Sequence, residues 1–315
     1  MKVTEHLAEA KRPLISFEII PPRRGGNVRS LMALVDDLVK HRPPFIDITS
    51  HPAEVVYEET PEGIQRTIKR KRPGTLGVCA LIQNKYDIDA VPHVLCHGFT
   101  QQETEDFLIE LRYLGIDNVL AIRGDDKGYR KPLREGRTAN RYARDLIAQI
   151  ADMNGGKYLD AYLDAAPTEF CIGCSGYPEK HFEAPNLATD IRRAKEKVDA
   201  GAEYIVTQMF FENSHYFAYV DACREAGINV PIIPGLKVLT TKKHLVSIPR
   251  TFHCELPRAL SDELEGAKKE HVFDVGVEWA LQQTRELLDR GVPSVHFYVM
   301  SSSKAVNAVI DKLDL

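Results

Sequence analysis

The sequence lacks any long apolar run. Across 315 residues, no uninterrupted hydrophobic stretch approaches the roughly 20 residues that a membrane-spanning helix needs. The amino terminus, MKVTEHLAEAKRP, carries charges throughout and has no apolar core of the kind found in a secretory signal peptide. These absences argue against a membrane protein and predict a cytoplasmic one.

An excess of positive charge is also missing. Lysine and arginine total 41 against 45 aspartate and glutamate residues, which gives a formal net charge of −4. A protein that binds nucleic acid usually presents a broad basic surface. The composition therefore predicts no polynucleotide partner.

Cysteine is sparse and scattered. Of six cysteines, only Cys171 and Cys174 lie close together in the sequence, and His181 follows them. A zinc site usually needs a second cysteine pair or well-spaced histidines. We therefore favour two small residues in a buried strand and expect no metal.

What the sequence does contain is a repeated order of amphipathic helix, glycine and short apolar strand. Examples are FLIELRYLGIDNVLAIRGD and TRELLDRGVPSVHFYVM. The glycines fit the left-handed position that closes a helix; they are Gly115, Gly201, Gly227 and Gly291. At the start of helices, Asn27 is a candidate cap, and Thr100 with Glu103 forms a candidate capping box.

Eight such strands are expected, at 14–20, 45–50, 90–96, 118–124, 170–176, 204–210, 231–236 and 294–299. Eight strands alternating with helices predict a (β/α)8 barrel, and we expect residues 1–315 to form one catalytic domain. A doubly wound open sheet is the alternative, although no G-x-G-x-x-G and no phosphate loop follows any strand. Residues 74–89 are expected to be helical, and 126–169 to contain an insertion.

The chemistry of a (β/α)8 barrel lies where its strands end, so polar residues at those positions are candidate site residues. They are Glu18, Thr49, His93, Arg123, Asp125, Tyr177, Gln208 and the region of Tyr298. Glu18 is the strongest, because burial of an unpaired carboxyl raises its pKa and suits an acid catalyst, while a core carboxyl paired with arginine is the alternative.

The other candidates also have structural alternatives. The alternative roles are a turn-initiating residue for Asp125, an ordinary strand residue for Thr49 and a satisfied core histidine for His93. Gln208 needs a polar partner, either a ligand or a backbone carbonyl. A helix face carries Asp190, Arg193 and Lys197 at spacings of three and four residues, which is typical of a solvated surface or, over a barrel mouth, of a pyrophosphate and ribose site.

Seven segments in order resemble the methylenetetrahydrofolate reductase family of the short bacterial type. They are FEIIPPR, VPHVLC, NVLAIRGD, GYPEKHFEA, KVDAGAEYIVTQMFF, IIPGL and HFYVM. The resemblance spans about residues 14–300. It implies a flavoprotein on a (β/α)8 barrel that binds FAD noncovalently, takes hydride from NADH or NADPH, and reduces 5,10-methylenetetrahydrofolate to 5-methyltetrahydrofolate by alternating half-reactions. Such an enzyme serves one-carbon metabolism and methionine supply.

The resemblance also implies roles for residues. Glu18 matches the family's catalytic glutamate, which protonates folate N10, and Asp125 matches an aspartate near flavin and pterin. Gln208 matches a folate-binding glutamine, and Tyr177 is a candidate to stack with a ligand. The matching FAD-binding positions are Thr49, His93, Arg123, Gly124, Asp125, Tyr177, His181, Asp190, Arg193 and Lys197.

The sequence departs from the family pattern in places. Where many members carry an arginine that pairs with the folate glutamate tail, this chain has Ser302, with Lys304 nearby. The segment after Thr49 reads SHPAE, and Arg193 stands where some members have asparagine. No regulatory domain is expected after the barrel, and a homo-oligomer is expected.

Two rival functions remain. One is a flavin-free aldolase or isomerase that uses Lys237 in PGLKV as a Schiff-base or phosphate lysine. The other is a folate or flavin sensor without turnover. Bound flavin discriminates against the first, and turnover against the second.

Overall fold

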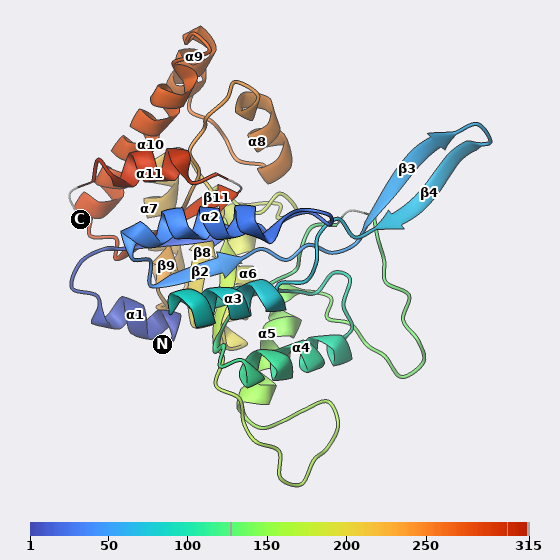
Figure 1. Ribbon diagram of the computed structural model, residues 1–315. Helices are drawn as coiled ribbons and strands as arrows, with labels where there is room; N and C mark the ends of the chain where they lie inside the picture. Colours follow the sequence, from blue (N-terminus) through green and yellow to red (C-terminus); the bar gives the residue numbers. More distant parts are fainter. Residues whose placement is uncertain (127, 301, 314–315) are drawn as a thin grey trace.

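The computed structural model describes residues 1–126, 128–300 and 302–313, and its main feature is a parallel sheet closed into a barrel (Figure 1). The strand order is β10-β11-β1-β2-β5-β6-β7-β8-β9. The strands are β1 (Leu14–Ile19), β2 (Phe45–Ile48), β5 (Asp89–Leu95), β6 (Asn118–Ile122), β7 (Cys171–Gly176), β8 (Tyr204–Thr207), β9 (Ile232–Ile233), β10 (Gly235–Leu236) and β11 (Ser294–Met300). Because β9 and β10 are consecutive segments on either side of Pro234, the sheet returns to its starting point.

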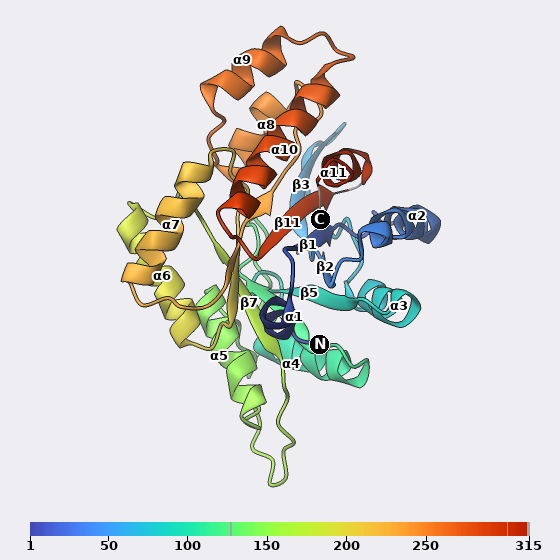
Figure 2. The same ribbon diagram turned by 90° about the vertical axis from the view of Figure 1, so that its left-hand side faces the viewer.

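Helices alternate with these strands and lie outside the barrel (Figures 1 and 2). They are α2 (Val28–Leu38), α3 (Leu76–Tyr86), α4 (Gln101–Tyr113), α5 (Ala143–Asn154), α6 (Leu187–Asp199), α7 (Asn213–Glu225), α8 (His244–Phe252), α9 (Arg258–Gly266), α10 (Val272–Asp289) and α11 (Lys304–Ile310), with the short 3-10 helix η1 (Val39–His41) after α2. The predicted (β/α)8 fold is confirmed.

Each predicted strand range contains a strand, and the range 231–236 holds two, because Pro234 has no N–H to continue the ladder. The predicted helix within 74–89 is α3. The sequence analysis missed an antiparallel hairpin between β2 and α3, formed by β3 (Glu54–Thr60) and β4 (Gly63–Lys69). Residues 126–169 hold α5 between two long loops.

Helix boundaries follow the local signals in the sequence. The Asn27 side chain accepts a 2.7 Å hydrogen bond from the amide of Arg29, and Thr100 with Glu103 forms the capping box at the start of α4. The four glycines expected to close helices all have positive φ, between 68° at Gly115 and 121° at Gly201. These residues fix where each helix ends and the next strand begins.

The barrel interior is apolar at its N-terminal end. The short helix α1 (Val3–Glu9) lies against this end, and the amide of Val3 donates a 2.8 Å hydrogen bond to Oδ1 of Asn118. The side chains in this layer pack as one buried cluster; they are Val3, Phe45, Val91, Leu120, Cys171, Tyr204, Val206 and Ile233. Polar side chains lie farther along β1, β2, β5 and β11, toward the strand ends where a catalytic site is expected.

Candidate active site

Glu18 lies near the C-terminal end of β1. Its side chain is 13% exposed, and Oγ1 of Thr49 donates a 2.9 Å hydrogen bond to its Oε1 atom. Burial raises the pKa of Glu18, and the neighbouring His93 offsets part of that rise. A carboxyl in this environment holds its proton at a higher pH than one in water, as a general acid must.

Asp47 on β2 and His93 on β5 complete a polar cluster around Glu18. The Nε2 atom of His93 lies 3.4 Å from Oε2 of Glu18 and 3.7 Å from Oδ2 of Asp47. Glu18 and Asp47 are register partners, so their side chains point to the same side of the sheet.

Asp47 is fully buried, and among the described residues neither of its carboxyl oxygens has a hydrogen-bond partner. Burial raises the pKa of Asp47 well above its usual range and lowers the pKa of His93. The physical consequence is a cluster that favours a protonated Asp47 and an uncharged His93. Glu18, Asp47 and His93 are called the interior cluster below.

The other side of the Glu18 environment is formed by β10, β11 and the residue after β10. Nζ of Lys237 donates a 2.7 Å hydrogen bond to the backbone carbonyl of Tyr298. The side-chain hydroxyl of Tyr298 in turn donates a 2.6 Å hydrogen bond to the backbone carbonyl of Thr207. Burial lowers the pKa of Lys237 to about 8, and the pKa of His296 to about 3. Lys237 therefore exchanges its proton more readily than an exposed lysine.

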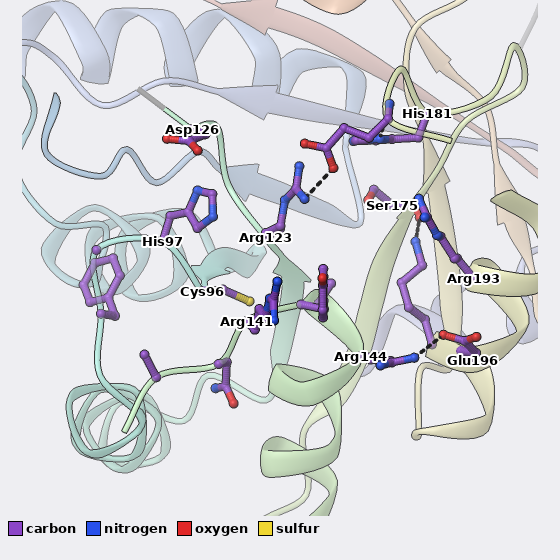
Figure 3. A pocket seen from close by; sticks show the side chains of 18 of the residues that line it. Cys96, His97, Arg123, Asp126, Arg141, Arg144, Ser175, His181, Arg193 and Glu196 are labelled. Carbon is purple, nitrogen blue, oxygen red and sulfur yellow. Dashed lines mark hydrogen bonds and ion pairs between the residues drawn. The ribbon is translucent and has the colours of Figure 1, made fainter. Parts of the chain in front are cut away.

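A cavity of about 1000 Å³ opens beside the ends of β5, β6 and β7 (Figure 3). Its lining contains eight cationic and four acidic side chains, which are Arg123, Arg130, Lys131, Arg141, Arg144, Arg192, Arg193 and Lys197 with Asp126, Glu183, Asp190 and Glu196. Glu18 does not line it. The excess of cations makes this space, called the cationic cavity below, suited to an anionic ligand.

Part of the charge in the cationic cavity is already paired. Arg123 forms a 2.6 Å ion pair with Glu183, and Arg144 forms a 2.5 Å pair with Glu196. Lys197 donates to the carbonyl of Ser175. Within the described part of the chain, Arg193 has no ion pair, so its guanidinium is available to a ligand.

The predicted trio on α6 faces this cavity. Asp190, Arg193 and Lys197 all line it, and the buried Asp190 carboxylate accepts a 3.0 Å hydrogen bond from the amide of His181. The rings of Tyr177 and His181 meet edge to face with centroids 4.7 Å apart. This face of α6 therefore adjoins a cavity and is not a wholly solvated surface, and its role as a pyrophosphate and ribose site stays a prediction.

The structure brings six predicted cofactor residues together in this lining, namely Arg123, Tyr177, His181, Asp190, Arg193 and Lys197. It places Thr49 and His93 at Glu18 instead. Gly124, at φ 83°, follows Arg123, and Asp125 is exposed in the same loop beside the lining residue Asp126. Gln208 follows β8, and its Oε1 atom accepts a 2.9 Å bond from the amide of Met209.

The sequence analysis missed several residues of both regions. Asp47 carries the same signal as Glu18, a lone carboxyl in an apolar strand, but it was not singled out. Arg141 and Arg144 were also missed, because they fall in the segment 126–169 that was set aside as an insertion. Arg144 could have been found from its position, because it is a charged residue at the start of the helix that follows β6.

No group of metal-binding side chains is found in the described ranges. Cys171 and Cys174 are both buried in β7. Cys171 belongs to the interior layer, whereas Cys174 packs in the larger core outside the barrel. Side chains alternate across a strand, so residues three apart face opposite ways and these two thiols do not converge on one ion.

Serine and lysine stand at the end of β11 where the family's arginine was expected. Ser302 and Lys304 are exposed, and the neighbouring Ser303 donates a 2.6 Å hydrogen bond to Asp37.

In the described ranges, no helix combines the length and the apolar character needed to cross a bilayer.

Similarity to a solved structure supports the fold. A protein from Clostridium thermocellum, described as binding two copies of 5-methyl-5,6,7,8-tetrahydrofolic acid, superposes with a TM-score of 0.60. The match covers 98% of this chain and 96% of that one at 14% sequence identity. At this level of identity the likeness concerns the fold alone.

Similarity in sequence is more informative. The chain is 30% identical to methylenetetrahydrofolate reductase 1 of Schizosaccharomyces pombe, over all of this chain and 49% of that protein. It is 27% identical to the 5,10-methylenetetrahydrofolate reductase of Salmonella typhimurium, over 99% of this chain and 94% of the relative. The chain thus spans about half the length of several curated relatives and nearly all of the bacterial one.

The family model for methylenetetrahydrofolate reductase matches residues 2–314, which include Glu18 and every residue of the cationic cavity. The match therefore covers the barrel as a whole rather than a shared fragment. The chain belongs to the methylenetetrahydrofolate reductase family.

Proposed function

We propose that this protein reduces 5,10-methylenetetrahydrofolate to 5-methyltetrahydrofolate, with noncovalently bound FAD and with NADH or NADPH as co-substrate. The observation that carries the proposal is Glu18, a nearly buried carboxyl of raised pKa at a barrel strand end, next to a cationic cavity in a chain of this family. When bound, the flavin relays hydride from the nicotinamide to the folate in two alternating half-reactions.

The lining of the cationic cavity fits FAD in charge. A dinucleotide presents a pyrophosphate, for which Arg193 and Lys197 supply cations, and ribose hydroxyls, for which the Asp190 carboxylate is an acceptor. Arg123 and His181 contribute the adjoining wall, Gly124 follows Arg123 in the chain, and the Tyr177 ring offers an apolar face for stacking. Thr49 and His93 would contact the cofactor only where it reaches the interior cluster.

Glu18 acts as the general acid in this proposal. The methylene bridge of the folate must open to an electrophilic iminium before hydride arrives, and opening requires protonation of N10. Burial lets Glu18 hold its proton to a higher pH than a carboxyl in water, and the hydrogen bond from Thr49 fixes Oε1, which leaves Oε2 as the oxygen that donates.

Two further residues orient and tune the reactants. Asp125 lies in the loop after β6 beside the cavity, where its negative charge would bias the flavin electrostatically. Gln208 offers its side-chain amide to the pterin. Its Oε1 atom becomes available when it gives up the hydrogen bond from the backbone amide of Met209. With Ser302 at the position of the family arginine, Lys304 is the nearby cation for the glutamate tail.

We further propose that the protein serves one-carbon metabolism and methionine supply, that it acts in the cytoplasm and that it is a homo-oligomer. The test is the visible absorption spectrum of the purified protein, recorded without oxygen before and after addition of 5-methyltetrahydrofolate. We expect an oxidised-flavin spectrum that bleaches, since the folate half-reaction then runs in reverse.

The other outcomes separate the rivals. A flavin spectrum that does not change on addition of the folate would support the assignment of FAD and contradict the assignment of the folate substrate. Failure to turn over folate with NADH or NADPH would favour the sensor alternative. Absence of flavin after reconstitution with FAD would favour the aldolase alternative, in which Lys237, with its pKa lowered by burial to about 8, is the nucleophile.

A further inference from the structure

One row of side chains crosses the barrel at the level of Glu18. Glu18 on β1 is the register partner of Tyr298 on β11 and of Asp47 on β2. On the other side of β11, the register with β10 continues so that Lys237, the residue after β10, lies level with Tyr298. Register partners point to the same face of a sheet. The row, called the acid row below, therefore consists in order of Lys237, Tyr298, Glu18 and Asp47.

Lys237 is the cation of the acid row, and its ammonium is only partly satisfied. The side chain is largely buried, and its stem borders a small recess lined by apolar side chains that include Phe211, Leu239 and Trp279. Nζ donates its 2.7 Å hydrogen bond to the backbone carbonyl of Tyr298. An ammonium has three N–H donors, and within the described ranges Lys237 forms no ion pair and no second hydrogen bond. A buried cation without a counter-charge is costly, so this position favours a nearby anion.

Glu18 is the carboxyl group that can become this anion. Burial raises the pKa of Glu18, and Lys237 is one of the groups that oppose the rise. Burial lowers the pKa of Lys237 to about 8, and Glu18 acts in the opposite direction. Each side chain therefore favours the charged form of the other. Asp47 lies one strand farther from Lys237, on the far side of Glu18.

The other titratable groups that face this pair belong to β2, β5, β11 and α8. Burial lowers the pKa of each histidine among them and raises the pKa of the aspartate and of the tyrosine, so all of them favour the uncharged form near neutral pH. They are His93, His244, His296, Asp47 and Tyr298. Of the described groups that act on Glu18, Lys237 is thus the one that is cationic.

We propose that Lys237 is a positioning residue for the acid, because its ammonium pairs with the carboxylate that forms when Glu18 gives its proton to the folate. This role rests on the reductase activity proposed above. In that step the O–H bond of Glu18 breaks, an N–H bond forms at N10, and the negative charge stays on Glu18, while Lys237 keeps its own proton. A fixed cation at this point stabilises charge that appears only as the proton leaves, so it favours the transition state over the resting site.

The test is the pH dependence of the folate half-reaction. The FAD-loaded protein with reduced flavin is mixed with 5,10-methylenetetrahydrofolate in an anaerobic stopped-flow instrument, at pH values between about 5 and 9. The reaction needs a protonated Glu18, so its rate falls as pH rises through the pKa of Glu18. Lys237 is charged below its pKa of about 8 and holds the pKa of Glu18 down.

Lys237→Met removes the charge and keeps a side chain of similar length. The pKa of Glu18 should then rise, so the fall in rate should move to higher pH by about one unit. This shift is expected for charges two strand spacings apart, roughly 10 Å, at an effective dielectric constant of ~20. Below the pKa, the rate should decrease about threefold, because Glu18 becomes a weaker acid.

Two further variants separate charge from structure. Lys237→Arg retains a cation and should retain most of the pH profile of the unmodified protein. Lys242→Met is the matched control, since the exposed Lys242 also donates its hydrogen bond to a backbone carbonyl, that of Glu265. Its pH profile should not change. Thermal melting of each variant checks that the barrel remains folded.

The proposal is overturned if Lys237→Met lowers the rate without moving the pH profile, if it leaves both unchanged, or if Lys237→Arg shifts the profile as far as Lys237→Met. Infrared titration measures the pKa of Glu18 without folate, because the band of its protonated carboxyl is the one that Glu18→Gln removes. A protein that does not reduce folate would contradict the proposed function. The infrared titration would still show whether Lys237→Met raises the pKa of Glu18, so the two failures are distinguishable.

Discussion

The interior cluster and the cationic cavity lie at the same end of the barrel, but they differ in how charge is balanced. In the interior cluster, Glu18 and Asp47 are buried side by side, and burial raises the pKa of both carboxyls. In the cationic cavity, Arg123 and Arg144 remain charged because carboxylates pair with them and solvent reaches them. The first region favours protonated carboxyl groups, and the second presents cationic side chains to a cavity.

This difference follows from solvent access rather than from residue type. A carboxyl without a cation becomes neutral when water is removed, whereas an arginine stays charged and requires a counter-charge. A site that must both protonate a substrate and bind a phosphate-bearing cofactor therefore benefits from two adjoining environments. The following predictions test that division, beginning with the largest expected effect.

Glu18→Gln should abolish proton donation in the interior cluster while leaving the cationic cavity intact. We expect reduction of the folate to slow by about 10²–10⁴-fold, the usual contribution of a general acid. FAD retention and flavin reduction by NADH or NADPH should be nearly unchanged. Anaerobic stopped-flow absorbance measures the two half-reactions separately.

The control is Glu105→Gln, the same chemical change on α4, where the carboxylate accepts a hydrogen bond from the amide of Leu159 far from the site. Normal folate reduction by Glu18→Gln would remove this residue from the mechanism. Equal loss in both half-reactions would point instead to a general structural role.

Arg193→Ala should weaken the cationic cavity without touching the interior cluster. A charge-assisted hydrogen bond contributes about 1.5–3 kcal/mol, so we expect FAD to bind roughly 10- to 150-fold more weakly. Titration of the flavin-free protein with FAD, followed by flavin fluorescence, gives the dissociation constant. The measurement should show a smaller effect at high salt.

Arg258→Ala is the matched control, because Arg258 is exposed on α9 and pairs with Asp262. Unchanged FAD affinity in Arg193→Ala would contradict the assignment of this cavity to the cofactor pyrophosphate.

Asp47→Asn should change how stability depends on pH. The folded-state pKa of Asp47 is raised by burial, so the wild type loses stability as pH rises from about 4, the unfolded value, through the folded value. The asparagine variant lacks this loss. Its stability relative to wild type should therefore increase with pH, by at most about 1.4 kcal/mol per unit.

Urea unfolding at a series of pH values between 4 and 8 measures this difference. Ser16→Ala, in the same barrel interior, is the control and should shift stability by a constant amount. A constant offset for Asp47→Asn, or one that decreases with pH, would show that Asp47 is ionised in the folded protein.

Gln208→Ala should have the smallest effect and should separate substrate from cofactor. Gln208 belongs to neither region, and the loss of one neutral hydrogen bond costs about 1 kcal/mol. We expect kcat/KM for the folate to fall about fivefold, with unchanged FAD affinity. Steady-state kinetics with varied folate measures it, and a parallel loss of FAD would place Gln208 at the cofactor instead.

Much of the barrel could be predicted because its signals are local. The left-handed glycine after each helix and the apolar strand that follows depend on a few adjacent residues, and Gly115 with β6 shows this directly. Glu18 stood out because a carboxyl is unusual in an apolar strand. The spacing of Asp190, Arg193 and Lys197 predicted a shared face but left open whether solvent or a cavity adjoins it.

The β3–β4 hairpin could not be predicted in the same way. Both of its faces carry charged side chains and most of its residues are partly or fully exposed, so its strands lack the pattern of a strand that covers a core. Asp47 was missed for a related reason, since its importance comes from the neighbouring strand that carries Glu18.

The sequence by itself determined the alternation of the barrel helices and strands, the parallel barrel and the placement of an acid at the end of the first strand. Backbone preferences and hydrophobic spacing act over short stretches, and a sequence displays them directly. The tertiary structure alone decided which charges share a space. Glu18 meets Asp47 and His93 because β1, β2 and β5 pair side by side, and Arg123 and Arg193 line one cavity because α6 packs beside the strand ends, although these residues are separated in the chain.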